Sequence, residues 1–123
     1  MISTATALYN FFSGFDLPAY NESTIPDDAE LPYIVYQLVE PEWSEKTIMY
    51  VRVYYRNKTS NFAALQKADE IAGAVGVGIR LDCQGGYVVL RPETPLIQPI
   101  PPENDIHGAL VTLQINSFHL AGM

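Results

Sequence analysis

The stretch TIMYVRVYYR, residues 47–56, carries the clearest secondary-structure signal in this chain of 123 residues. Apolar side chains alternate along it with tyrosine and arginine, and this period of two is typical of a β-strand. One face of the strand would hold Met49, Val51, Val53 and Tyr55. The other face would hold Tyr50, Arg52, Tyr54 and Arg56. The pattern predicts a strand that packs one face on a core and presents the other to solvent or to a partner.

The neighbouring residues predict a hairpin partner before this strand and a helix after it. Tyr33 to Glu40 is rich in Tyr, Ile and Val, and a polar connection up to Lys46 would join it to the first strand. Ser60 can cap a helix whose apolar positions recur with helical spacing. That apolar stripe is Ala64, Leu65, Ala68, Ile71, Ala72 and Val75.

The chain begins with a predicted one-faced helix, which is followed by an acidic loop. Ser3 or Thr4 can cap the helix, and Gly14 suits its end. Its apolar face would be Leu8, Phe11, Phe12 and Phe15. Residues 16–32 contain three prolines and five acidic side chains without periodicity, which predicts an exposed flexible arm.

The second half of the chain predicts a second hairpin, a proline-rich arm and a last strand. Ile79 to Cys83 and Tyr87 to Arg91 flank the turn signal Gly85-Gly86. Residues 92–108 hold five of the nine prolines, so we expect a flexible, extended arm that stays out of the sheet interior. A final strand is predicted over residues 109–116, where apolar and polar side chains alternate.

Together these elements predict a single α+β domain over residues 1–123. The expected architecture is an antiparallel sheet of about five strands with two helices packed on one face, in the order α-β-β-α-β-β-β. The single cysteine, Cys83, excludes an internal disulfide and any zinc module that needs several cysteines. The sequence shows neither a signal peptide nor a stretch apolar enough to span a membrane, so we expect a product of the cytoplasm.

The charges are divided unevenly along the chain. The net charge is -7, from 14 acidic and 7 basic side chains. All seven bases fall within residues 46–91, and eight of the acids precede that range. The acid excess makes a nucleic-acid coat improbable, because such binding needs clustered Lys and Arg.

The residues that could suggest catalytic or binding motifs lack the spacing or the neighbouring elements that such motifs need. The glycines of residues 73–78 close a predicted helix, whereas a nucleotide-binding loop opens one. His107, His119, Cys83 and Asp105 lack the close spacing of metal ligands, and residues 27–30 lack the pattern of a calcium loop. We therefore predict no catalytic, cofactor-binding or metal-binding residues and no enzymatic activity.

Protein contact is the function that the residue types favour. Tyr and Arg dominate interface hot spots, and Trp43 lies in the loop beside the Tyr/Arg strand face. The predicted interface comprises Trp43, Tyr50, Arg52, Tyr54, Arg56, Asp27, Asp28 and Glu30. If the acidic arms of one copy reached the basic middle of the next, repeated heterologous contacts would form a ring or a filament. The alternative is that a helix of the same chain covers the Tyr/Arg face.

Six stretches spread along the chain resemble the tail-terminator family of long-tailed bacteriophages, a group of small head-tail joining (neck) proteins. They are the opening helix through Phe15, LPYIVY at 31–36, VYY at 53–55, FAALQ at 62–66, GYVVLR at 86–91, and DIHGALVTL at 105–113 running on to Phe118. The resemblance implies an α+β subunit that forms a hexameric ring. Such a ring caps the tail tube and docks to the head connector.

On this resemblance the chain is a structural virion protein, assembled in the host cytoplasm, with the tail tube protein and head connector proteins as partners. DNA would pass through the lumen without sequence-specific binding, and no membrane is involved. A head-completion, stopper or minor capsid protein of the same neck region is an alternative. A second alternative is a small ligand-binding module with a pocket between the sheet and the helices.

Overall fold

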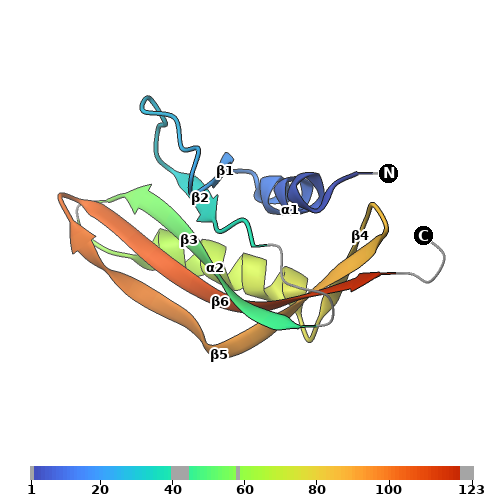
Figure 1. Ribbon diagram of the computed structural model, residues 1–123. Helices are drawn as coiled ribbons and strands as arrows, with labels where there is room; N and C mark the ends of the chain where they lie inside the picture. Colours follow the sequence, from blue (N-terminus) through green and yellow to red (C-terminus); the bar gives the residue numbers. More distant parts are fainter. Residues whose placement is uncertain (1, 40–44, 58, 120–123) are drawn as a thin grey trace.

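A curled six-stranded sheet runs through the molecule, and both helices lie on the same side of it (Figure 1). This computed structural model describes residues 2–39, 45–57 and 59–119. The elements are α1 (Thr4–Phe12), a 3-10 turn (Ser13–Phe15), β1 (Ala19–Asn21), β2 (Tyr33–Tyr36), β3 (Lys46–Arg56), α2 (Phe62–Val75), β4 (Ile79–Cys83), β5 (Gly86–Glu103) and β6 (Ile106–His119). The predicted α+β class is confirmed.

The sheet differs from the prediction in strand number and in strand direction. Its order is β1-β2-β3-β6-β5-β4, with β1 parallel to β2 and every other pair of neighbours antiparallel. The predicted sheet of about five antiparallel strands, with the order α-β-β-α-β-β-β, was wrong because β1 adds a parallel sixth strand. This strand of three residues lies inside the segment 16–32. It is too short to show an alternating pattern among the proline and acidic residues around it.

Local hydrogen bonds account for the start and end of the helices. The Ser3 hydroxyl accepts a hydrogen bond from the backbone N–H of Thr6 at 3.1 Å, as expected for the cap of α1. Helix α2 begins at Phe62, whose backbone N–H donates to the Ser60 hydroxyl at 3.0 Å, and it ends before Gly76, which has a φ of 57°. Within the described ranges, neither helix has the length and apolar character needed to cross a membrane.

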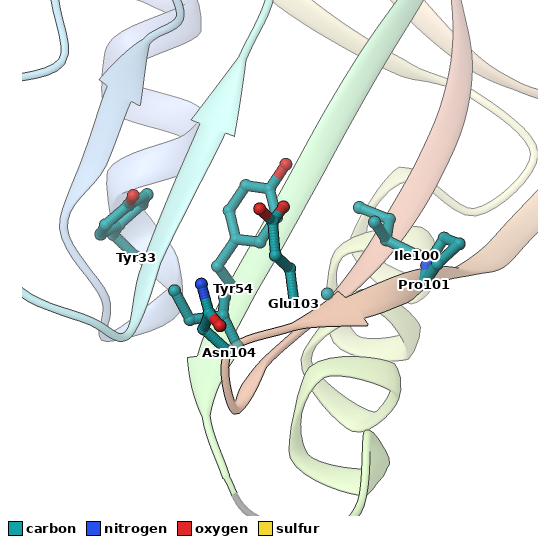
Figure 2. Close-up of a pocket in the computed structure, with 8 residues that line it drawn as sticks. Tyr33, Tyr54, Ile100, Pro101, Glu103 and Asn104 are labelled. Carbon is teal, nitrogen blue, oxygen red and sulfur yellow. The ribbon is translucent and has the colours of Figure 1, made fainter.

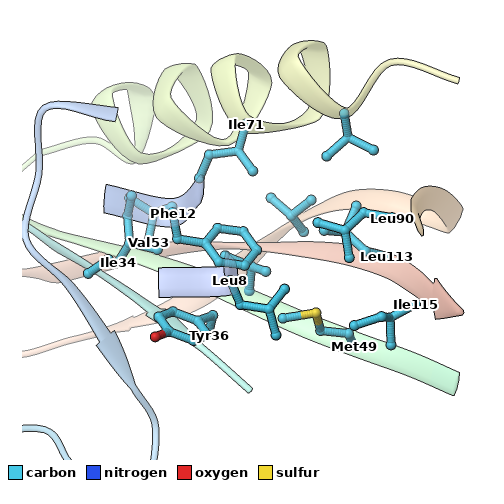
Figure 3. Close-up of a cluster of buried hydrophobic side chains, with 14 of the residues drawn as sticks. Leu8, Phe12, Ile34, Tyr36, Met49, Val53, Ile71, Leu90, Leu113 and Ile115 are labelled. Carbon is cyan, nitrogen blue, oxygen red and sulfur yellow. The ribbon is translucent and has the colours of Figure 1, made fainter. Parts of the chain in front are cut away.

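One apolar core fills the space between the helices and the sheet (Figure 3). Leu8 and Phe12 from α1 and Ile71 from α2 meet the inward side chains of the strands. The fully buried large side chains are Phe12, Leu8, Ile34, Met49, Ile71, Leu90, Leu113, Ile115, Val51, Val53, Val75 and Val88. These side chains fill the space between the sheet and the helices, where the ligand-binding alternative placed its pocket.

The proline-rich segment 92–108 belongs to the sheet instead of forming a separate arm. Residues 92–103 continue β5 and pair with β6, with register shifts after Pro92 and after Ile100. β4 pairs only with residues 86–90 of β5, so the later part of β5 has a strand partner on one side only in the described structure. Proline is tolerated on such an edge because no ladder hydrogen bond needs its missing N–H. Asn104 and Asp105, with φ of 50° and 66°, close the β5–β6 hairpin.

Candidate interaction surface

The Tyr/Arg face of β3 lies on the side of the sheet opposite the helices. Met49, Val51 and Val53, which alternate with its members along the strand, are fully buried in the core with side chains of α1 and α2. Because neighbouring side chains of a strand point to opposite faces, Tyr50, Arg52, Tyr54 and Arg56 point away from both helices. Neither helix of the described structure covers this face, so the alternative of a covering helix is wrong.

Residues from the neighbouring strands extend this face, which we call the outer face. Val35 and Leu110 flank Arg52 in the register, and Thr112 lies beside Tyr50. The Tyr50 side chain is 37% exposed in the middle of the sheet, where a core-facing residue would be buried. The outer face therefore combines aromatic, aliphatic and arginine side chains, which is the composition of protein interfaces.

Three tyrosines form a contiguous aromatic group on the outer face. The Tyr20 and Tyr33 ring centroids are 5.7 Å apart, and those of Tyr33 and Tyr54 are 6.0 Å apart, both with edge-to-face geometry. Burial raises the pKa of the Tyr54 hydroxyl, while the Arg52 guanidinium opposes this shift and Tyr33 adds to it. Tyr54 therefore remains a neutral hydrogen-bonding group at physiological pH.

Part of the charge segregation is neutralised within the chain. Glu22, just after β1, lies 3.4 Å from Arg52, with the Glu22 Oε2 and Arg52 Nη1 atoms in contact. Arg56 and Glu30 both line a surface hollow beside Tyr33. The acidic segment 16–32 thus contacts the basic strand β3 of its own copy. The sequence analysis expected this contact between one copy and the next.

The structure places the remaining predicted interface residues less closely together. Asp27 and Asp28 are exposed in a turn of the segment 16–32. Trp43 lies outside the described residues. The structure therefore brings Tyr50, Arg52, Tyr54, Arg56 and Glu30 toward the outer face, with the two aspartates in the adjoining loop.

A pocket on the outer face was missed by the sequence analysis. Tyr33 and Tyr54 face the tip of the β5–β6 hairpin across a volume of about 390 Å³ (Figure 2). Its other lining residues are Ile100, Pro101, Glu103, Asn104, Ile106 and Gly108. The sequence placed most of these residues in a free arm, which separated them from the tyrosines. Asn104-Asp105 was the signal that could have found the hairpin, because both residues tolerate positive φ.

The groups considered for other chemistry have structural roles in the described residues. Cys83 is buried, and the Thr4 hydroxyl donates to its sulfur at 3.6 Å. Gly76 and Gly78 end α2, with their backbone N–H groups donating to the carbonyls of Ala72 and Val75. Among the described residues no three His, Cys, Asp or Glu side chains are grouped so that they could hold a metal ion.

Comparison with known proteins gives a match to the fold alone. No protein-family model matches the chain, and no curated protein matches its sequence. One solved structure, of a protein whose designation states no function, superposes with a TM-score of 0.64 at 15% sequence identity. The superposition covers 94% of this chain and 94% of the other. The arrangement of strands and helices is therefore shared with a known structure.

Proposed function

We propose that the chain is a structural subunit of a phage virion. Six copies of this subunit form a ring like that of a tail terminator. The ring caps the tail tube and docks to the head connector. The observation that supports this most is the outer face, where Tyr50, Arg52 and Tyr54 stand on a rigid sheet without a covering helix in the described structure. Tyrosine and arginine on such a surface are the residues expected at the centre of an interface.

The resemblance to tail terminators described above supports the same function. The charge distribution also supports it, since acidic and basic surfaces on one chain allow contacts between copies. The acid excess lets DNA pass through the lumen, because a negative wall does not displace the counterions of DNA. Tight DNA binding at physiological salt would contradict this last feature.

The test uses the purified chain and tail tubes polymerised from the major tail protein of a long-tailed phage. We expect light scattering to detect a ring, alone or on the tube, and electron microscopy to show tubes that stop growing. Tyr50→Ser should weaken assembly by about 30-fold, as loss of a hot-spot residue worth about 2 kcal/mol would. Tyr9→Ser is the matched control, because Tyr9 is 51% exposed on α1 and away from the outer face. Tubes that grow unchanged with the protein present would refute the proposal.

A head-completion, stopper or minor capsid protein would use the same kind of ring on a different particle. The two roles separate when the protein is offered tail tubes and tailless heads together. A terminator binds the tube end, and a stopper or capsid protein binds the head.

The Tyr33–Tyr54 pocket favours a second candidate, a ligand-binding module. Its volume of about 390 Å³ is within the range of about 300–1,000 Å³ that is typical of small-molecule sites. A thermal-shift screen tests this candidate, because a ligand at 100 times its Kd stabilises the folded state by about 2.7 kcal/mol. A hit that Tyr54→Leu abolishes would support the module over the virion subunit.

A further inference from the structure

The Tyr33–Tyr54 pocket is acidic and aromatic. Glu103 is the one side chain with a formal charge among the residues that line it, and Glu103 is exposed. The figure shows its carboxylate on the same side of the hairpin as the Tyr54 ring (Figure 2). Asp105 lies at the hairpin tip, and Arg56 and Glu30 line the adjoining hollow. Three carboxylates therefore surround this end of the outer face, with one guanidinium among them.

This combination suits an organic cation. The faces of tyrosine rings attract an ammonium or guanidinium group within about 6 Å of the ring centre. A carboxylate beside the rings adds a charge-assisted hydrogen bond. Ile100, Pro101 and Ile106 supply apolar walls that can contact the methylene stem of a lysine or arginine.

Most basic side chains of the described residues already have a partner in their own copy. Arg52, Lys67 and Arg80 form ion pairs with Glu22, Glu70 and Asp82. Arg91 donates to the side-chain oxygen of Asn116 at 3.5 Å. Arg56 lies at the same end of the sheet as the pocket.

Lys46 is the described base that is left at the other end of the outer face. It is exposed at the start of β3, and no ion pair holds it in the described structure. Glu93 lines the same shallow hollow, and hydrogen bonds from the Gln114 amide and the Thr94 backbone N–H lower the pKa of its carboxyl group. The charge of Lys46 adds to this shift, but no ion pair joins the Lys46 and Glu93 side chains in the described structure. Lys46 and Arg56 are ten positions apart along β3, which corresponds to about 33 Å at roughly 3.3 Å per residue. Arg56 pairs with Ile106 and Ile106 with Glu103, so Lys46 cannot reach the pocket of its own copy.

We propose that the Tyr33–Tyr54 pocket receives the Lys46 ammonium group of a second copy of the chain, with Glu103 as its counter-ion. The contact joins two different sites, one on each copy, and in the ring proposed above it is heterologous and repeats from subunit to subunit. The inference rests on the proposed function, because it specifies how neighbouring subunits of the ring meet.

Carbodiimide cross-linking tests the contact directly, because the reagent joins an amine to a carboxylate only where the two touch. Equal amounts of unlabelled and ¹⁵N-labelled protein are mixed under assembly conditions, treated, digested and analysed by mass spectrometry. We expect Lys46–Glu103 amides that join labelled to unlabelled peptides. The ion pair between Lys67 and Glu70, at 2.9 Å, should form an amide within one copy and serves as the reaction control. Lys46→Arg should abolish the intermolecular link while assembly remains, since the charge is kept and the amine is lost.

Charge reversal gives an independent readout. Lys46→Glu and Glu103→Lys should each weaken self-association about tenfold or more, and their mixture should restore it, because every contact in an alternating assembly is again between opposite charges. Oligomers that form without the Lys46–Glu103 link would overturn this inference and leave the proposed ring intact. A protein that shows the Lys67–Glu70 control link, stays monomeric and fails to bind tail tubes would overturn both.

Discussion

The Tyr54 ring in β3 lies over Gly108, its partner in the register of β6. A Cβ atom at residue 108 would be 2.9 Å from Cδ1 of Tyr54 and 3.0 Å from Cδ1 of Ile100. Both distances are shorter than ordinary contacts between carbon atoms, which lie near 3.5–4.0 Å. The absence of a side chain at Gly108 therefore sets the position of the tyrosine that forms one wall of the outer-face pocket.

Gly108→Ala should destabilise the fold by about 1–3 kcal/mol, because the new methyl group overpacks against Tyr54 and Ile100. Urea unfolding measures the loss. Gly73→Ala is the control, since Gly73 lies within α2 and its added Cβ would meet no atom within 4 Å. That substitution should stabilise the protein by up to about 1 kcal/mol. Equal effects of the two substitutions would contradict the packing of Tyr54 over Gly108.

Phe12→Ala should cost about 3–5 kcal/mol of unfolding free energy. The Phe12 side chain is fully buried, and its ring stacks on Tyr36 with centroids 5.0 Å apart. Phe62→Ala is the matched control, because Phe62 is 69% exposed at the start of α2 and its loss should change stability by less than about 0.5 kcal/mol. If thermal or urea unfolding showed a loss below about 1 kcal/mol for Phe12→Ala, α1 would not be part of the folding unit.

The sequence predicts this core well, because burial on one face leaves a periodic pattern. The alternation in residues 47–56 and the stripe of α2 identify side chains that the structure buries, apart from Tyr55, Leu65 and Ala72, which are half-buried. The same pattern predicts which residues form the outer Tyr/Arg face, because neighbouring side chains of a strand point to opposite faces of the sheet. These features depend only on neighbours within one element.

The missed features depend on contacts between distant segments. β1 has three residues, too few for any period, and it is held by pairing with β2. The prolines of residues 92–102 argue against a strand in general, yet they are compatible with an edge whose position only the topology reveals. The pocket was missed for the same reason, since it joins Tyr33 and Tyr54 to that edge.

Gln114→Ala should raise the pKa of Glu93 toward its ordinary value. The Gln114 amide donates to the Glu93 carboxylate at 2.5 Å, and this hydrogen bond is the main cause that lowers the pKa of Glu93; the Thr94 backbone N–H and Lys46 contribute further. Because the folded pKa lies below the unfolded pKa of about 4.3, the contribution to stability is present above that pH. It is lost as the pH falls through the folded value.

An NMR titration of the Glu93 side chain gives the pKa, and urea unfolding across the acid range gives the linked stability. Near neutral pH the wild-type protein should be more stable than Gln114→Ala, and this difference should shrink as the pH falls through the folded pKa of Glu93. Gln98→Ala is the control, because Gln98 is an exposed glutamine on the adjacent strand β5. A Glu93 pKa that is the same in all three proteins would show that the hydrogen bond does not persist in solution.

Arg56→Gln should weaken self-association at low salt, because Arg56 is an exposed charge on the outer face that can pair with the exposed Asp27 or Asp28 of a neighbouring copy. No ion pair holds it in the described structure. Arg56→Glu should weaken association further, by about tenfold in all, since exposed charge pairs are worth up to about 1 kcal/mol each and the reversal adds repulsion. At about 1 M salt the Debye length falls to about 3 Å, and the difference from wild type should disappear.

Gln66→Glu on α2 lowers the net charge by the same amount as Arg56→Gln, and it should leave assembly unchanged because Gln66 is exposed on a helix away from the outer face. Sedimentation velocity at both ionic strengths makes the comparison. Equal weakening by Arg56→Gln and Gln66→Glu would assign the effect to net charge instead of to the outer face.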